Sequence, residues 1–176
     1  MSEQPTGVPR EEYRPSPSDI APKLADLQVG RTVVTASIPL SRADLVRYAG
    51  ASGDYNHIHW NERFAREVGL ENVIAHGMLT MGSVVSRIAE WAVDPGAIVD
   101  YRTRFTSPVV VPDAESGAPD TPTTSLEMTA SVGAVDTEAG IAHLDVEAVS
   151  YTHLRAHETP EHLVCRLLLE KKKKKH

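Results

Sequence analysis

The pattern of apolar and polar positions predicts a strand near the start of the chain. Residues 31–38 are rich in β-branched side chains and lie between Gly30 and Pro39. Strands are typically bounded by such turn-forming residues. We therefore expect a strand within residues 28–40.

Two short helices separated by a loop are expected next. Ser41 can cap the first helix, because an acidic residue, Asp44, stands three positions later. Glycines close this helix near Gly53, so residues 54–59 should form a loop. Asn61 can cap the second helix.

Residues 77–92 have a different pattern. Large apolar side chains spread around the helical wheel, with the small residues Gly82, Ser83 and Ser86 between them. A helix that is apolar on most sides is a buried helix. The small residues would let a sheet approach it closely.

Only strand-like runs follow the long helix. They comprise residues 98–105, 109–111, 126–135 and 141–149, separated in part by a proline-containing loop at residues 112–124. The last two runs alternate between apolar and polar residues, as half-buried antiparallel strands do. Together these elements predict an α+β fold, in which a curved antiparallel sheet wraps around one long buried helix.

The segment after Val149 differs in character from the rest of the chain. Residues 1–149 contain 21 Asp and Glu against 11 Lys and Arg, a net charge of −10, whereas residues 150–176 contain 3 against 7, a net charge of +4. This segment also holds the only cysteine, Cys165, and a run of five lysines. It resembles the conceptual translation of a sequencing-library adapter that continues into a homopolymer A tract. The alternative is a basic amphipathic helix that binds a partner or an anionic surface.

These features predict three parts in the chain. Residues 1–24 contain five prolines and few large apolar side chains, which is typical of a mobile arm. Residues 25–149 form the domain, and residues 150–176 are expected to be a non-native tail, an artefact. The sheet would then lack its last strand and expose an open edge, so we expect the chain to be poorly stable alone.

The acidic body argues against a nucleic-acid partner, because phosphate neutralisation requires a basic face. The chain contains no apolar run of 18 residues and no secretory signal pattern, and residues 1–149 contain no cysteine. We therefore expect a cytoplasmic protein without a membrane span.

The polar cluster at residues 52–59, Ser-Gly-Asp-Tyr-Asn-His-Ile-His, carries the candidate chemistry. A carboxylate (Asp54), an imidazole (His59) and the N-terminus of a helix (Gly77) can together add or remove water beside a thioester carbonyl. Taken singly, Asp54 is more often a turn former and His59 more often a structural histidine.

The residues of this cluster also suggest a metal site as an alternative. His57, His59, His76 and Asp54 are residue types that bind transition metals. However, two histidines spaced two apart on a loop are frequent without a metal. We expect no metal and no other cofactor, and we expect His76 to hydrogen-bond near the start of the long helix.

The motif resembles a known family. Tyr48, the Ser-Gly-Asp run, Asn56, the Ile-His pair and the Ala-His-Gly-Met run at residues 75–78 are similar to the MaoC-like (hydratase-2) branch of the hot-dog fold. Over about residues 27–149 the chain looks like the catalytic subunit of actinobacterial (3R)-hydroxyacyl-acyl-carrier-protein dehydratases. In that family an Asp-x-Asn-x-x-His run is followed eighteen residues later by a glycine, here Gly77. The family commonly has proline where this chain has His57, and its loss would loosen the loop.

The resemblance implies a site and a reaction. Asp54 and His59 would form the catalytic pair, Asn56 would orient the pair or the water, and the Gly77 N–H would face the thioester oxygen. The reaction would be the reversible hydration of trans-2-enoyl thioesters to (3R)-3-hydroxyacyl thioesters, carried on CoA or on an acyl carrier protein (ACP), in fatty-acid metabolism. The protein would form a homodimer, or a heterodimer with a hot-dog subunit that lacks the pair.

Two other functions remain open from the sequence. One is a non-catalytic, acyl-thioester-binding hot-dog subunit, against which the intact Asp54 and His59 weigh. The other is a hot-dog thioesterase, which usually places its carboxylate on or near the central helix. In residues 77–91 the only carboxylate is Glu90, at the far end.

Overall fold

The computed structural model describes residues 21–152 and the strand at residues 161–170. In chain order the elements, with 3₁₀ helices written η, are η1 (Leu24–Asp26), β1 (Thr32–Leu40), α2 (Arg42–Ser52), η2 (His57–His59), α3 (Glu62–Glu67), α4 (Gly77–Ala92), η3 (Pro95–Ala97), β2 (Ile98–Phe105), β3 (Thr124–Asp136), β4 (Ile141–Thr152) and β5 (Glu161–Glu170).

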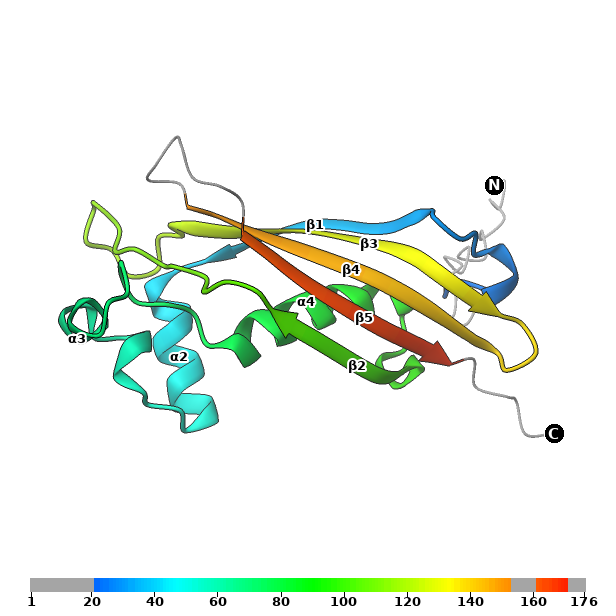
Figure 1. The fold of residues 1–176 in the computed structure, drawn as a ribbon, viewed down its shortest axis with the longest axis horizontal. Helices are drawn as coiled ribbons and strands as arrows, with labels where there is room; N and C mark the ends of the chain where they lie inside the picture. The colour runs from blue at the N-terminus through cyan, green and yellow to red at the C-terminus, as the bar shows by residue number, and fades with distance from the viewer. Residues whose placement is uncertain (1–20, 153–160, 171–176) are drawn as a thin grey trace, which may run out of the picture.

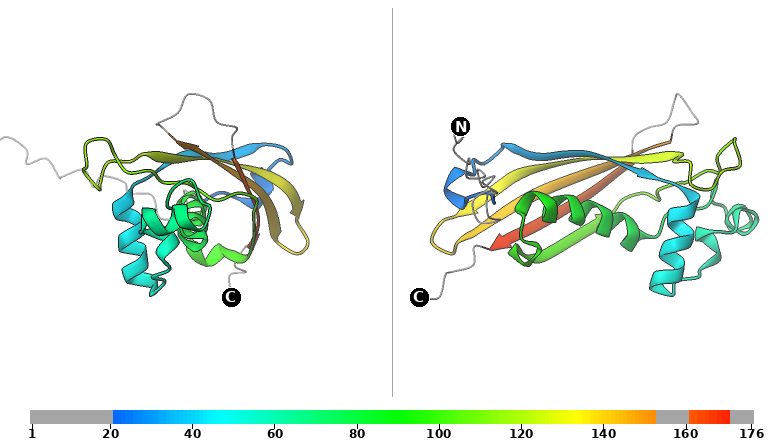
Figure 2. Two further views of the ribbon diagram at one scale, coloured as in Figure 1. Left: turned by 60° about the vertical axis from the view of Figure 1, so that its left-hand side comes forward. Right: turned by 180° about the vertical axis from the view of Figure 1, so that it is seen from behind.

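The five strands form one antiparallel sheet in the order β1-β3-β4-β5-β2. The sheet lies over α4, and α2 and α3 sit together at one end of the molecule (Figure 1). In the view turned by 60°, the sheet is curved and α4 lies on its concave side (Figure 2, left). This arrangement confirms the predicted α+β fold, a curved antiparallel sheet around a long helix.

The structure differs from the sequence-based prediction at the last strand. β4 continues past Val149 to Thr152, and β5 pairs with β4 on one side and β2 on the other. The sheet therefore has a strand at the position that was expected to be missing. The reason is that residues 161–170 are mostly apolar and of strand length, while the facing edges of β4 and β2 carry backbone groups that need hydrogen-bond partners. The non-native origin of this segment stays a prediction.

The predicted strand at residues 109–111 does not join the sheet. It instead pairs with the segment before α4, through the bridge between Ile74 and Val110 and the backbone hydrogen bonds Ala75 N to Val109 O (2.8 Å) and Val111 N to Val73 O (2.9 Å). This short pairing fixes the path of residues 73–75, which lead into α4.

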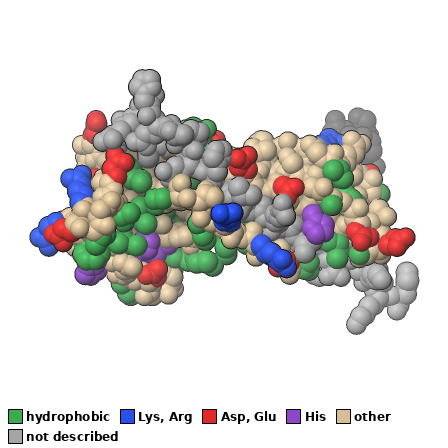
Figure 3. Space-filling model, in the orientation of Figure 1, with side chains coloured by type: hydrophobic (Ala, Val, Ile, Leu, Met, Phe, Trp, Pro, Cys, Tyr) green, Lys and Arg blue, Asp and Glu red, His purple; other side chains and the backbone are tan. Residues whose placement is uncertain are grey.

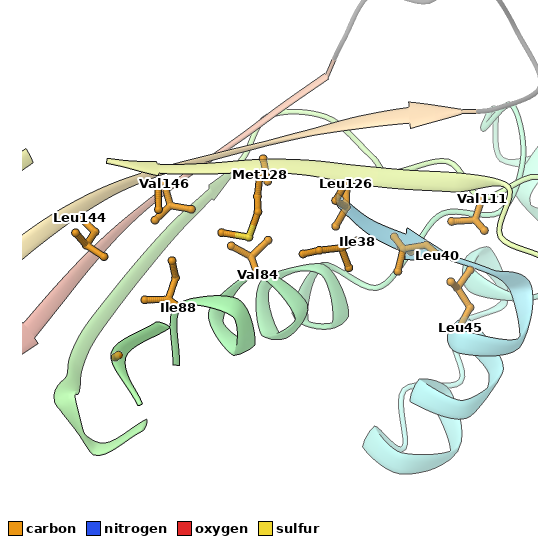
Figure 4. Close-up of a cluster of buried hydrophobic side chains, with 14 of the residues drawn as sticks. Ile38, Leu40, Leu45, Val84, Ile88, Val111, Leu126, Met128, Leu144 and Val146 are labelled. Atoms are coloured by element: carbon orange, nitrogen blue, oxygen red, sulfur yellow. The ribbon is translucent and has the colours of Figure 1, made fainter. Parts of the chain in front are cut away.

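The core lies between the sheet and α4. β4 alternates in burial as its sequence pattern predicts: Leu144 and Val146 are buried, and Asp145 between them is exposed. Figure 4 shows these side chains and Met128 of β3 pointing toward Val84 and Ile88 of α4. Burial of each such side chain stabilises the fold by about 1.5–3 kcal/mol.

Helix α4 buries one stripe of its surface. Its buried residues lie one turn apart: Thr80, Val84, Ile88 and Ala92. The other apolar residues of α4 are partly exposed, and Met78 is 55% exposed. The sheet thus covers one face of a helix whose sequence is apolar on most sides.

The remaining expectations concern the N-terminal arm, membrane spans, cellular location and stability. The predicted arm at residues 1–24 falls outside the described residues up to residue 20. Among the described helices, none has the length and apolar character needed to cross a membrane. The expected cytoplasmic location and the low stability of the chain alone stay predictions.

Candidate active site

Asp54 directly follows the C-terminal cap of α2. Gly53 caps the helix with φ +75°, a left-handed conformation that glycine adopts without strain, and its N–H donates to Ala49 O (3.0 Å). The Ser52 hydroxyl donates to Tyr48 O (2.8 Å) and accepts from Asp54 N (3.2 Å). The backbone at Asp54 is therefore anchored to the last turn of α2.

The two carboxylate oxygens of Asp54 have different roles. Oδ1 accepts a hydrogen bond from Asn56 N (3.2 Å), the turn-forming contact expected of an aspartate in a loop. Oδ2 lies 3.9 Å from His59 Nε2. The side chain is 52% exposed. Asp54 thus forms the turn with one oxygen and turns the other toward His59.

His59 is buried, and its ring is oriented by a backbone carbonyl. It ends η2, which Asn56 caps by accepting from Ile58 N through Oδ1 (3.2 Å). His59 Nδ1 lies 2.7 Å from Ile74 O. Because a carbonyl oxygen only accepts, Nδ1 carries a proton, and Nε2 is the ring nitrogen that faces Asp54.

His76 lies beside the pair and is also buried. Its ring stacks on that of His59, with centroids 3.7 Å apart and planes 24° apart, and the Tyr48 ring lies 4.9 Å away. His76 Nε2 lies 3.1 Å from Asp54 O. Burial is the largest influence on His76 and lowers its pKa; the hydrogen bond to Asp54 O opposes this, and the smaller charge effects of His59 and Asp54 act in opposite directions.

A cavity of about 370 Å³ opens beside His59. Its lining residues are His59, Ile74, Ala75, Gly77, Thr80, Phe105, Thr106, Ser107, Pro108 and Val109. Gly77 begins α4, whose first backbone bond is Thr80 N to His76 O (3.2 Å), so the N–H groups of the first turn have no partner within the helix. A Cβ at Gly77 would lie 3.1 Å from the Phe105 ring, so glycine permits this close approach.

His57 occupies the position where a proline was expected from the resemblance. Its ring packs edge-on against Trp60 (centroids 4.7 Å apart) and Phe64 (5.2 Å). Trp60 Nε1 donates to Tyr55 O (3.0 Å), which ties the two sides of the loop together. Aromatic contacts therefore brace the loop in place of the fixed φ angle of proline. In Figure 3, histidine side chains lie among hydrophobic ones at the end of the molecule that carries α2 and α3.

Asp54, His59 and His76 are also the candidates for a metal site, since one ligand atom from each lies within 4.8 Å of the others. The geometry fits a metal poorly. His59 Nδ1 and His76 Nε2 are engaged with backbone carbonyls. The lone pairs of the remaining ring nitrogens lie in two stacked planes, so they do not converge on one point.

The structure brings together most of the predicted site residues. Asp54 and His59 face each other, and Gly77 lines the same cavity as His59. Asn56 stands in the same loop, where it caps η2. The sequence reasoning missed the Ile74 carbonyl and the wall at residues 105–109, because a backbone acceptor and a distant loop carry no side-chain motif.

Glu90, the carboxylate considered for a thioesterase, lies near the C-terminal end of α4 and pairs with Arg87 (2.9 Å). It is thirteen residues from Gly77, which corresponds to about 20 Å along a helix. This carboxylate therefore does not reach the cavity beside His59.

The chain is similar to one known family and to several known proteins. Residues 25–118 match the family model described as MaoC like domain. The chain is 42% identical over 77 residues to 3-hydroxyacyl-thioester dehydratase X of Mycobacterium tuberculosis, covering 44% of this chain and 26% of that protein. It is 35% identical over 89 residues to 3-hydroxybutyryl-CoA dehydratase of Methylorubrum extorquens, covering 50% of this chain and 56% of that protein. The chain thus spans about half or less of these curated relatives.

Solved structures support the fold. A MaoC-like dehydratase superposes with a TM-score of 0.73 at 28% identity, covering 97% of this chain and 49% of that one. A chain of the ChsH1-ChsH2 complex from Mycobacterium tuberculosis superposes with a TM-score of 0.62 at 18% identity, covering 82% and 98%. The fold is therefore the hot-dog fold that the sequence resemblance implied.

Proposed function

The chain belongs to the MaoC-like domain family, and we propose that it is a hydro-lyase that interconverts trans-2-enoyl and (3R)-3-hydroxyacyl thioesters of fatty-acid metabolism. One observation carries this proposal: Asp54 Oδ2 lies 3.9 Å from Nε2 of His59, and His59 lines a cavity that also reaches the first turn of a helix. The names of the related dehydratases support it.

The spacing of the pair suits the activation of water. A separation of 3.9 Å is too long for a direct hydrogen bond, but one water oxygen can lie about 2.8 Å from both atoms. In the hydration direction this water adds its oxygen to C3 of the enoyl thioester. One group of the pair takes the proton from the water, and a proton is delivered to C2. Dehydration reverses both transfers.

The start of α4 supplies the electrostatic part of the mechanism. Addition at C3 places negative charge on the thioester oxygen before C2 is protonated. The N–H of Gly77 lies at the positive end of the helix dipole, where it can donate to this oxygen. We assign Asn56 to orienting the pair, because it caps the short helix that carries His59.

The orientation of the His59 ring fits both directions of the reaction. Since Nδ1 is held by Ile74 O, Nε2 is the nitrogen that can exchange a proton with the water or the substrate. No step requires a metal or another cofactor. We propose that the carrier is CoA or an acyl carrier protein.

A second hot-dog subunit is part of the proposal. The faces of α4 that the sheet does not cover are apolar and partly exposed, with Met78 55% exposed. Such a surface suits burial against a partner. One of the similar structures, the ChsH1-ChsH2 complex, is itself an assembly of two named subunits. We propose a homodimer or a heterodimer of this kind.

The test is hydration of crotonyl-CoA and of a long-chain enoyl-CoA, followed as loss of enoyl absorbance. Asp54→Asn and His59→Gln should each lower kcat by about 10²–10⁴-fold, the usual contribution of a general acid or base. Asp120→Asn is the matched control, because this carboxylate is exposed and pairs with Arg47 instead. Turnover by Asp54→Asn at the normal rate would refute the assignment, as would a wild-type protein that releases thiol but does not hydrate.

A further inference from the structure

His76 touches all three parts of the proposed site, although the mechanism gives it no proton to carry. Its ring stacks on His59, and its Nε2 contacts the backbone of Asp54. Its own backbone precedes Gly77 and accepts the first hydrogen bond of α4. It is 2% exposed. A single buried side chain therefore connects the loop, the imidazole and the helix start.

The protonation state of His76 follows from its contacts. The Asp54 carbonyl can only accept, so Nε2 carries the proton and Nδ1 presents a lone pair. Nδ1 is buried and has no hydrogen-bond partner among the described residues. Because burial lowers the pKa of His76, the ring is neutral at neutral pH.

An unpaired buried acceptor is costly and needs a reason. Leaving such a group unsatisfied destabilises a fold by about 1–3 kcal/mol. A phenylalanine would fill the same volume and stack on His59 without this cost. What phenylalanine lacks is the Nε2–H that donates to Asp54 O. The contact that distinguishes histidine at this position is thus the hydrogen bond to the backbone of Asp54.

We propose that His76 is a positioning residue for the Asp54–His59 pair: its Nε2–H holds the Asp54 backbone while its ring supports the face of His59, and together these contacts set the 3.9 Å gap that one water bridges. This inference rests on the hydratase function proposed above. It assigns His76 no direct contact with substrate.

Two substitutions of similar size separate the donor from the ring. His76→Gln keeps an amide N–H near the position of Nε2 but loses the ring, whereas His76→Phe keeps the ring and loses the donor. A misplacement of about 1 Å in a catalytic group can cost about 10²-fold in rate. We expect His76→Phe to lower kcat by about 10–100-fold with KM within about twofold, and His76→Gln to recover kcat to within about fivefold of wild type.

The control is a histidine outside the site. His143 is exposed on β4, and His143→Phe should leave kcat and KM unchanged. A role for His76 in packing alone predicts the opposite ranking, because phenylalanine fills the space better than glutamine. Equal kcat for His76→Phe and wild type, or a slower His76→Gln than His76→Phe, would overturn the inference.

A second measurement does not depend on turnover. Long-range ¹H–¹⁵N correlation spectra of the imidazoles should show His76 as the Nε2–H tautomer. A His76 ring that is protonated at Nδ1 near neutral pH would overturn the positioning role even in an active enzyme. A wild-type protein that hydrates no enoyl thioester would overturn the proposed function, and this inference with it.

Discussion

Arg42 joins four segments around the site, and its removal gives the sharpest stability prediction. Its Nε donates to Val111 O (2.6 Å), and its Nη2 donates to Asn72 Oδ1 (2.6 Å) and to Glu62 Oε2 (2.9 Å). The Arg42 side chain is only 14% exposed, whereas that of Glu62 is 34% exposed. One guanidinium thus connects the start of α2, helix α3, Asn72 just before α4 and Val111 in the segment that pairs with residues 73–75.

The expected loss for Arg42→Met follows from these contacts. Breaking a fully buried ion pair costs about 3–5 kcal/mol, because a charge is left without its partner. Here Glu62 is a third exposed and also contacts Arg66 (2.6 Å), so part of this cost is avoided. The loss of the bonds to Val111 and Asn72 remains. We expect a loss of about 2–3 kcal/mol, which for a chain of this size lowers Tm by about 4–12 °C.

Arg66→Met is the matched control, because Arg66 contacts the other oxygen of the same carboxylate but is 63% exposed. An exposed pair of this kind contributes about 0–1 kcal/mol. Thermal unfolding followed by circular dichroism at physiological salt compares the two variants. Equal Tm shifts for Arg42→Met and Arg66→Met would contradict this reasoning, in which the burial of Arg42 and its bonds to Val111 and Asn72 set the loss of stability.

Three further predictions concern the loop, the pH dependence and the last strand. His57→Ala removes two edge-on aromatic contacts and should cost about 0.5–1.5 kcal/mol in a denaturant melt, and an unchanged midpoint would contradict the bracing role. Burial lowers the pKa of His76 in the folded protein below its value in the unfolded chain, so in acid the unfolded chain binds more protons than the folded protein. The free energy of unfolding should therefore fall as the pH drops below about 6.5 and through the pKa of the folded state. The Tm of His76→Phe, measured from pH 7 to 5, should fall less steeply, and parallel curves would contradict this. Ending the chain at Thr152 removes β5, which among the described strands is the only sheet neighbour of β2. The thermal unfolding of the shortened chain should therefore be less cooperative. Identical unfolding curves for the two chains would show that β5 adds nothing to the fold.

Local chemistry made the helices and their starts predictable. Ser41 and Asp44 form the reciprocal capping box that their spacing indicates, and Asn61 caps α3 through Phe64 N. In both helices the deciding contact involves side chains whose identity is visible in the sequence. The place of Gly77 came instead from the family resemblance, and the structure has it line the same cavity as His59.

Pairing between distant segments was less predictable. The run at residues 109–111 has the composition of a strand, but it pairs with residues 73–75, which have too short a pattern to be recognised. The apolar pattern of α4 predicted burial on most sides, whereas the sheet of one chain can cover only one face. Hydrophobic pattern indicates that a surface becomes covered, but it does not identify the covering element.

The Ile74 carbonyl that accepts from His59 Nδ1 has a consequence for how this site varies among sequences. A main-chain oxygen is present whatever side chain position 74 carries. The orientation of the imidazole therefore depends on the backbone path of residues 73–75. A substitution at residue 74 therefore leaves the hydrogen bond to His59 intact so long as that backbone path is preserved. A deletion or insertion in this segment would instead rotate the acceptor away while every residue of the Asp-x-Asn-x-x-His motif stayed intact. An inactive homologue of this kind would be identified by the length of the segment before α4, and not by its motif.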